Sequence, residues 1–243
     1  MKIVSKHKVA VRVCGLLVID ALLSRFTSDY AVHVHYADGD ALPPGATLCT
    51  IQSDVATLLM LERTILNFLR HLCAVATLTR TFVDAVVGTP LKILDTRKTL
   101  PGLRHLEKYA VHCGGGVNHR MGLYDAIMIK NNHVDLLGGM QATLTCLQNP
   151  HHLPVIIEVR NQAELAIALA QASTIERVLL DNMSNEELSV SAALCRGKLT
   201  TEASGNLTID RIRSIAETGV DYASIGAITH SAGNVDLSMR VVT

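Results

Sequence analysis

Residues 154–182 read PVIIEVRNQAELAIALAQASTIERVLLDN, two short apolar runs separated by a helical stretch. The first run contains Glu158 near its end, and the second ends at Asp181. A short apolar run, a helix and another apolar run form the pattern of a parallel strand–helix–strand unit. This stretch therefore predicts two neighbouring parallel strands, each with a carboxylate at its carboxyl end.

The same rhythm runs through the chain from Lys92 onward. The four other apolar segments are KILDT (92–96), AIMIK (126–130), KLTTEAS (198–204) and YASIGA (222–227). All six segments end in chemically useful groups, as expected of a β/α barrel, whose active site lies at the carboxyl ends of its strands. A site at the switch point of a doubly wound sheet would draw on only two or three of them. We therefore expect an α/β barrel of six strands.

The first third of the chain predicts a smaller region in front of this barrel. Alternating residues lead to a turn at Gly15 and an apolar helix, and a further strand pattern surrounds the turn at residues 38–40. A long helical pattern then runs from Val55 to Val87. We expect that helix to join the two regions.

Composition limits the classes of function. The 243 residues are 49% hydrophobic and 18% charged, which is typical of a folded globular protein and excludes disorder. Basic and acidic residues number 22 each, so the sequence as a whole gives no reason to expect nucleic acid or an anionic membrane as a partner. The most apolar stretch, 65–87, is interrupted by charged residues and predicts no transmembrane helix.

Six cysteines are scattered without a C-x-x-C pair. Their spacing supports neither a metal cluster nor a disulfide framework. We therefore expect buried thiols in a reducing cytoplasm.

Positive charge is concentrated between residues 97 and 130. The basic residues there are Arg97, Lys98, Arg104, Lys108, Arg120 and Lys130. Arg104 and Lys108 are four apart on a predicted helix, so for these two we expect an ordinary solvated face. The other four adjoin turns or strand ends, where guanidinium and ammonium groups bind carboxylate or phosphate. We interpret them as a local anion site.

A glycine run lies inside this basic stretch, in CGGGVNHR (113–120). Three consecutive glycines suit a chain that passes close to another group, and a plain turn is as consistent with them as a phosphate loop. The run ends in Asn-His-Arg, so we expect it to deliver His119 and Arg120 into a pocket.

The remaining strand ends suggest ligands for phosphate and metal. Glu158 and Asp181 on neighbouring strands suit Mg²⁺ carrying a pyrophosphate, although either residue could instead cap the helix that follows it. Small residues at 204–206 and at Gly226 free backbone N–H groups for a phosphate monoester, with His230 one turn further on. From the residues alone, these features predict binding of anions and a divalent ion and leave the reaction open.

At these residues the sequence resembles the quinolinate phosphoribosyltransferase family. The segments that carry the resemblance are LERTILNFLRHLCAVATLTRTFVDAV (61–86), ILDTRKTLPGLRHLEKYAVHCGGGVNHRMGLYDAIMIKNNHV (93–134), LLDNMS (179–184), TEASGN (201–206) and TGVDYASIGAITHSAGNVDLSMR (218–240). The second segment is long and highly specific. The resemblance extends from about Lys8 to the carboxyl terminus.

The resemblance implies a two-domain α/β protein of the type II phosphoribosyltransferase class. It implies an N-terminal α/β sandwich over residues 1–66, with the tail 235–243 packed against it, and an open six-stranded α/β barrel over 67–234. It also implies a cytoplasmic homodimer or higher oligomer, in which the sandwich of one subunit covers the barrel mouth of the other. Neither nucleic acid nor membrane is an implied partner.

The implied reaction transfers phosphoribosyl from phosphoribosyl pyrophosphate to quinolinate with decarboxylation, giving nicotinate mononucleotide, pyrophosphate and CO₂ in NAD biosynthesis. Matching positions assign catalysis to Lys98, Lys130, Glu158 and Asp181, with Mg²⁺ held near the two carboxylates. The substrate-binding positions implied by the resemblance are Arg63 (serving the partner subunit), Arg97, Lys98, His119, Arg120, Lys130, Ser204, Gly205, Asn206, Gly226 and His230.

The sequence departs from the family pattern in three ways. It starts near the family's first strands, without the usual N-terminal helices, and it carries Asn131 and Ile156 where acids are usual. Two alternatives therefore stay open: a transferase for another aromatic acid such as nicotinate, and a truncated inactive or regulatory paralogue. The other phosphoribosyltransferase superfamily is disfavoured, because Asp181-Asn182 supplies one acid where that class has two.

Overall fold

The computed structural model describes residues 1–149 and 151–242, and the chain forms two compact units. Unit 1 comprises Met1–Thr81, Lys98–Gly116 and Ala227–Thr243, and unit 2 comprises Phe82–Arg97 and Val117–Gly226. Each unit has its own sheet, so each is described by itself.

All six apolar segments that mark strands in the sequence are strands of one sheet in unit 2. They are β6 (Lys92–Leu94), β7 (Ile127–Ile129), β8 (Val155–Val159), β9 (Arg177–Asp181), β10 (Thr200–Ser204) and β11 (Tyr222–Ser224). Their order is β6-β11-β10-β9-β8-β7, and every neighbouring pair is parallel. The sheet is open, with β6 and β7 at its two ends. The prediction of an open six-stranded α/β architecture is confirmed.

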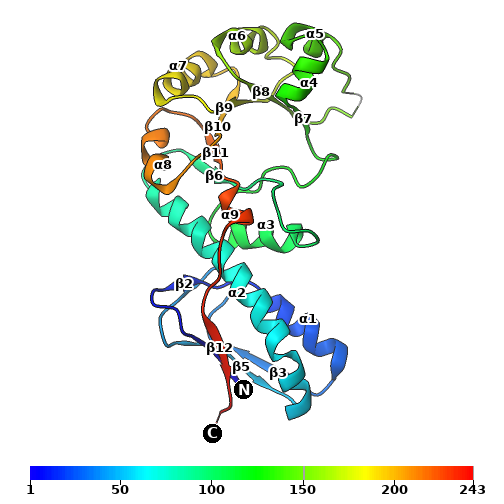
Figure 1. Ribbon diagram of the computed structural model, residues 1–243, viewed down its shortest axis with the longest axis vertical. Helices are drawn as coiled ribbons and strands as arrows, with labels where there is room; N and C mark the ends of the chain where they lie inside the picture. Colours follow the sequence, from blue (N-terminus) through cyan, green and yellow to red (C-terminus); the bar gives the residue numbers. More distant parts are fainter. Residues whose placement is uncertain (150, 243) are drawn as a thin grey trace. The chain divides into compact units, whose positions relative to one another are not determined.

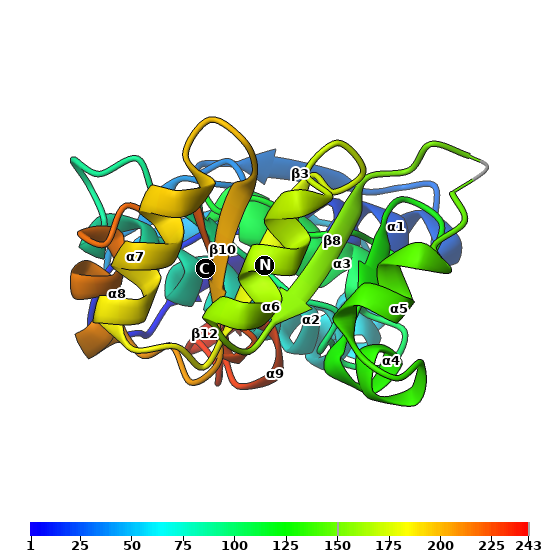
Figure 2. The same cartoon turned by 90° about the horizontal axis from the view of Figure 1, so that it is seen from above.

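Helices cover one side of this sheet. They are α4 (Asn131–Leu136), α5 (Met140–Thr145), α6 (Gln162–Ala170), α7 (Asn185–Cys195) and α8 (Ile209–Ala216). Figures 1 and 2 show α6 and α7 on the outer face of the curved row of strands. Strand β8 is buried along its whole length.

Unit 1 is built on an antiparallel sheet in the order β12-β1-β5-β3. Its strands are β1 (Lys2–Ser5), β3 (Ala31–Val34), β5 (Thr47–Gln52) and β12 (Leu237–Arg240), and a two-stranded ladder pairs β2 (Val11–Arg12) with β4 (Ala41–Leu42). Helices α1 (Leu16–Phe26) and α2 (Val55–Ala85) contribute to the core with residues such as Ile19, Leu23 and Leu69, all fully buried. The mixed α/β prediction is confirmed here too.

Helix α2 has almost the predicted extent, Val55–Ala85 against an expected 55–87. It passes without a break through residue 66, where the sequence predicts a domain boundary. That boundary stays a prediction. Unit 1 also contains α3 (Arg104–Cys113) and α9 (Ala227–His230). None of the helices that the structure describes is both long and apolar enough to cross a membrane.

The glycine run after α3 is explained in part by close packing against α2. A Cβ atom on Gly114 would lie 2.5 Å from the carbonyl oxygen of Ala76 and 2.6 Å from Cβ of Thr79. One on Gly116 would lie 2.8 Å from Cγ2 of Thr79. Real Cβ atoms do not approach other atoms so closely, so these two positions require glycine. The run brings α3 against α2 and then leads toward His119.

Candidate functional site

The carboxyl ends of the strands in unit 2 gather the polar side chains that the sequence places there. Asp181 at the end of β9 is in register with Ser204 at the end of β10, and Glu158 of β8 is in register with Leu179 of β9. Lys130 follows β7, the next strand on the other side of β8. Because these strands are parallel neighbours, the four polar residues share one edge of the sheet, where α/β barrels bind their substrates.

Lys130 and Glu158 form an ion pair across the ends of β7 and β8. The Lys130 Nζ atom lies 3.1 Å from Oε2 of Glu158, and the two side chains are 53% and 8% exposed. The backbone N–H of Lys130 also donates to Nδ1 of His133 at 2.9 Å, which fixes the start of α4. The buried carboxylate therefore has a largely exposed cation as its partner.

Ile156, at a position where the resemblance leads one to expect an acid, is an apolar core residue. It is 4% exposed and packs with Ala126, Leu179 and Met128. The apolar neighbours match the apolar side chain, so no buried charge is left without compensation at this point.

His119 is held in a defined orientation at the end of β6. Its backbone N–H donates to Oδ1 of the buried Asp95 at 2.8 Å, and its Nδ1 accepts the backbone N–H of Arg120 at 2.7 Å. With Nδ1 accepting, the neutral ring carries its proton on Nε2. That nitrogen lies 3.4 Å from Oε2 of Glu202. The imidazole is therefore fixed in one tautomer and one direction.

Glu202 is the centre of this part of the site. It is fully buried, and its Oε2 accepts from Nη1 of Arg177 at 3.0 Å. Burial by itself raises the pKa of Glu202, but hydrogen bonds from His119, Ser224 and Arg177 outweigh that effect, so the net pKa lies below its usual value. The carboxylate is thus held ionised inside unit 2. Glu202 is not among the predicted site residues; its only signal in the sequence is its place near the end of TTEAS.

Two guanidinium groups of the predicted anion site lie close together. Burial lowers the pKa of Arg120, and the positive charge of Arg97 lowers it further, against an opposing effect of Asp125. Nη1 of Arg120 donates to the carbonyl oxygen of Ala126 at 2.8 Å. Ala126 directly precedes β7, so this bond holds the guanidinium group beside the start of that strand. Two like charges brought together in this way favour a bound anion, which removes their repulsion.

Asn182 connects the loop after β9 to the loop after β10 through hydrogen bonds. Its Nδ2 donates to Oδ2 of Asp181 at 3.0 Å, and its Oδ1 accepts from Nδ2 of Asn206 at 3.3 Å. Asn182 and Asn206 have positive φ values of 56° and 49°, and a Cβ on Gly205 would overlap the Asn182 amide. These strained loops hold Asp181 beside the Ser204–Asn206 turn. Asn182 is a second residue that the sequence reasoning left out of the site, although it follows Asp181 directly.

Neither carboxylate of the predicted metal site caps a helix. The side chain of Asn161 accepts from Glu164 N at 3.0 Å at the start of α6, and Ser184 accepts from Glu187 N at 3.2 Å at the start of α7. The alternative that Glu158 or Asp181 serves as a helix cap is therefore wrong. Both retain oxygens that can face a cation.

Three predicted site residues belong to unit 1. Lys98 is exposed, and its carbonyl oxygen accepts from Oγ1 of Thr229 at 2.7 Å, which places Lys98 next to α9. His230 ends that helix, with Nδ1 2.6 Å from Oγ of Ser231. Arg63 is exposed on α2. Gly226 is the last residue of unit 2, directly before α9.

The expectation of a solvated face at Arg104 and Lys108 is wrong for Lys108. Lys108 is 1% exposed, next to the fully buried Glu107 on α3. His71 Nε2 lies 2.8 Å from Oε1 of Glu107. Only Arg104 is partly exposed, with its Nε donating to Thr99 Oγ1 at 3.1 Å. Spacing on a helix does not reveal which side of it is covered, and here the covered side includes the lysine.

Comparisons with known proteins agree over both units. The family model for the N-terminal domain of quinolinate phosphoribosyl transferase matches residues 1–73, and that for the C-terminal domain matches residues 75–240. The chain is 37% identical over 249 residues to quinolinate phosphoribosyltransferase [decarboxylating] 2a of Nicotiana tabacum, a mitochondrial protein by its name. That match covers 95% of this chain and 70% of the tobacco protein.

Bacterial proteins match as well. The chain is 41% identical over 229 residues to the nicotinate-nucleotide pyrophosphorylase [carboxylating] of Mycobacterium leprae, covering 93% of this chain and 79% of that protein. The solved structure of the nicotinate-nucleotide pyrophosphorylase from Francisella tularensis superposes with a TM-score of 0.92 at 37% identity. It covers 98% of this chain and 84% of that one.

Proposed function

The chain belongs to the quinolinate phosphoribosyltransferase family, and from that premise we propose that the carboxyl edge of the sheet in unit 2 is its active site. The activity is transfer of phosphoribosyl to quinolinate with decarboxylation, in NAD biosynthesis. The observation that carries the proposal is the charge pattern at this edge. Cations stand at the ends of β6 and β7, and carboxylates stand at the ends of β8 and β9.

The cations suit quinolinate, which is a dianion. We propose that Arg97 and Arg120 bind its carboxylates, because a guanidinium group suits a carboxylate and the charge of Arg97 acts on Arg120. His119 would present a ring to the same ligand, oriented by Asp95 and Glu202. Lys130 would contribute a further positive charge when its ammonium group turns from Glu158 to a quinolinate carboxylate. Lys98 is a further proposed ligand of quinolinate, on the ground of the family match.

The carboxylates suit Mg²⁺, which binds one or two carboxylates together with waters and substrate phosphates. Glu158 and Asp181 end neighbouring strands, and neither is used as a helix cap. An oxygen-only pair of this kind fits a hard cation. Mg²⁺ held there would neutralise charge that builds up on the departing pyrophosphate. Glu158 is available for this role once Lys130 turns to the quinolinate carboxylate.

The turn after β10 suits the 5′-phosphate of the ribose. Ser204, Gly205 and Asn206 form a loop with left-handed residues, and small side chains there leave backbone N–H groups accessible to an anion. We propose that this turn and Gly226 hold the phosphate, with His230 as a further donor. A Cβ at Gly205 would displace the Asn182 amide and, through it, Asp181.

The chemistry that follows uses positioning and charge. The quinolinate ring nitrogen forms a bond to C1 of the ribose as the bond from C1 to pyrophosphate breaks. The positive charge on the nitrogen stabilises the electron pair that stays on the adjacent ring carbon when the bond to the carboxylate breaks and CO₂ leaves, and a proton from solvent then takes the place of the carboxylate on that carbon. In this scheme the cations of the site hold the ring carboxylates in place and require no covalent intermediate with the protein.

We further propose a homodimer in which Arg63 serves the partner's site. Val55, Leu59 and Arg63 recur every four residues and so form one stripe along α2. Val55 and Leu59 are 67% and 58% exposed, and an exposed apolar stripe that ends in arginine is typical of a protein interface. A reducing compartment such as the cytoplasm suits six cysteines that are all free.

Lys130→Met tests the proposed role of the anion site in recognising quinolinate. Because Lys130 would make a charge-assisted contact to a carboxylate, we expect the KM for quinolinate to rise about thirtyfold. The measurement is the initial rate of nicotinate mononucleotide formation at saturating phosphoribosyl pyrophosphate. Lys198→Met, an exposed lysine before β10 in the same unit, is the matched control and should leave KM unchanged.

Two outcomes would overturn the proposal. An unchanged KM in Lys130→Met would remove Lys130 from the site. Nicotinate used as efficiently as quinolinate by the unmodified protein would favour the transferase for another aromatic acid.

A further inference from the structure

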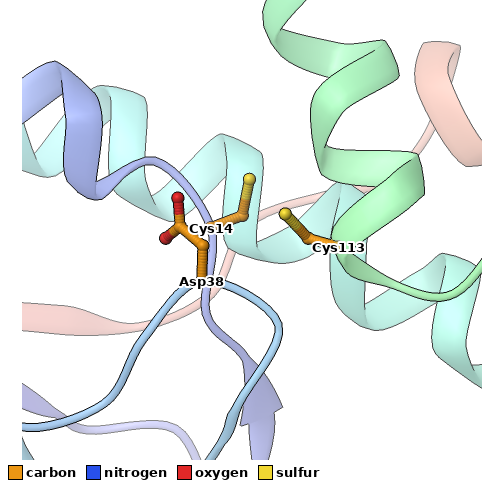
Figure 3. Close-up of side chains that lie close together, drawn as sticks. All are labelled: Cys14, Asp38 and Cys113. Carbon is orange, nitrogen blue, oxygen red and sulfur yellow. The ribbon is translucent and has the colours of Figure 1, made fainter.

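A cluster of three metal-binding side chains lies in unit 1, apart from the residues proposed for catalysis. Cys14 precedes α1, Asp38 lies in the loop between β3 and β4, and Cys113 is the last residue of α3. One ligand atom of each lies within 4.8 Å of one ligand atom of each of the others. Figure 3 shows the two sulfur atoms turned toward one another, with the Asp38 carboxylate beside Cys14. Three segments that are distant in sequence thus bring two thiols and a carboxylate together.

The surrounding structure holds these side chains in place. The backbone N–H of Cys14 donates to Sγ of Cys73 at 3.3 Å, and the Cys73 thiol donates to the Cys14 carbonyl oxygen at 3.4 Å. Asp38 accepts from the Tyr109 hydroxyl at 2.9 Å and from Leu16 N at 3.3 Å. Tyr109 lies one helical turn before Cys113 on α3. Orienting partners of this kind are usual around metal ligands.

The electrostatics of the cluster favour a bound cation. Two thiols and a carboxylate lie within 4.8 Å of one another, so ionised sulfur atoms would repel each other and the Asp38 carboxylate. A divalent ion between the three groups would reverse that effect, since it stabilises all the charges at once.

The donor set also selects the kind of ion. Two sulfur ligands exclude hard ions such as Mg²⁺ and Ca²⁺ and suit Zn²⁺ and similar thiophilic ions. Tetrahedral Zn²⁺ has Zn–S bonds of about 2.3 Å and Zn–O bonds of about 2.0–2.2 Å, so its ligand atoms lie roughly 3.5–4 Å apart. That separation fits inside the 4.8 Å limit of this cluster. Cys14 is fully buried, whereas Asp38 and Cys113 are half-buried, which leaves a side open for the ion to enter.

We propose that Cys14, Asp38 and Cys113 form a binding site for one thiophilic divalent cation, with Zn²⁺ as the test ion and solvent in the fourth position. The ion would be structural. It would join the segment before α1, the loop between β3 and β4, and the end of α3, where the glycine run begins. Such a site is separate from the carboxylate pair proposed for Mg²⁺, since the two differ in ligands and in the ions they select.

The test is zinc binding by the full chain after reduction and removal of metal with a chelator. We expect about one Zn²⁺ per chain by mass spectrometry under native conditions. Co²⁺ in place of Zn²⁺ should give thiolate charge-transfer absorption and the intense visible bands of tetrahedral coordination. At free zinc about 100 times the dissociation constant, the melting temperature should rise by roughly 5–10 °C.

Variants identify the ligands. Cys113→Ser should abolish the charge-transfer band or weaken zinc binding at least tenfold, and Asp38→Asn should weaken binding about tenfold or more. Cys146→Ser removes an exposed cysteine in unit 2 and should bind zinc as the unmodified chain does. Circular dichroism of each variant shows that it is folded, and Cys113→Ser is preferred to Cys14→Ser because Cys113 is only half-buried.

Three outcomes would overturn the proposal. One is the absence of zinc binding by the folded, reduced chain. Another is binding that is undiminished in a folded Cys113→Ser variant. The third is a Cys14–Cys113 disulfide formed with hydrogen peroxide at the same rate whether or not Zn²⁺ is present, because a bound ion would protect both thiols. That last result would identify an oxidisable thiol pair instead.

Discussion

Glu202→Gln is expected to lower the free energy of unfolding by about 3 kcal/mol at neutral pH. The substitution keeps the size of the side chain and removes the charge that faces Arg177 and His119. Arg177 then stays in a buried position without its anion, which is the costly part of the change. We also expect kcat/KM to fall about hundredfold, because His119 loses the negative charge toward which its Nε2 points. Urea unfolding and initial rates measure the two effects.

The pH dependence of this effect follows from the lowered pKa of Glu202. A carboxyl group whose pKa in the folded state lies below its ordinary value of 4.5 stabilises the protein at higher pH. That contribution is lost as the pH falls below 4.5 and through the lowered pKa. The difference in stability between the unmodified chain and Glu202→Gln should therefore be full at neutral pH and shrink on acidification.

Glu217→Gln is the matched control. Glu217 pairs with Arg213 on the surface, with side chains 63% and 53% exposed, so its removal should change stability by less than about 0.5 kcal/mol. Equal effects of the two substitutions, or a Glu202→Gln difference that grows as the pH falls, would contradict the role assigned to Glu202.

Asp181→Asn is expected to lower kcat/KM by about 10²–10³-fold and to raise the Mg²⁺ concentration needed for half-maximal rate. The amide lacks the negative charge that we propose faces the cation. Stability should change little, because Asp181 is only half-buried and its amide partner Asn182 can still form a hydrogen bond with asparagine. Initial rates over a Mg²⁺ titration, together with thermal unfolding, separate the two effects.

Asp210→Asn provides the comparison for Asp181. Asp210 is an exposed carboxylate in the first turn of α8 in the same unit, and its loss should leave the Mg²⁺ titration unchanged. If Asp181→Asn also left that titration unchanged, Asp181 would have no part in binding the cation.

The strands of unit 2 could be predicted from the sequence because their signal is local. Each is a short apolar run with a polar end, and parallel packing then places all those ends at one edge. Glu158, Asp181 and Ser204 could be found in this way, since position on a strand decides where they lie.

Glu202 could not be assigned in the same way. Its partners Arg177 and His119 lie on other segments, and a buried pair between distant residues leaves no periodic pattern. The prediction that Lys108 is exposed was wrong for a related reason. Its burial depends on what covers α3 rather than on α3 itself.

The cysteine cluster, too, could not be predicted from the sequence, because its residues are distant along the chain. Metal sites are usually recognised by closely spaced ligands, as in C-x-x-C. Cys14, Asp38 and Cys113 have no such spacing, and only the folding of unit 1 brings them together. The glycine run was noticed in the sequence, but the close contacts of Gly114 with Ala76 and Thr79 were not predictable from it.

Release of CO₂ from quinolinate labelled in its 2-carboxylate tests the central claim most directly. The unmodified chain should release labelled CO₂ only when quinolinate, phosphoribosyl pyrophosphate and Mg²⁺ are all present, and Lys98→Ala should release far less. No release by folded protein with all three components, or equal release by Lys98→Ala, would contradict the assignment of decarboxylating transfer to this site.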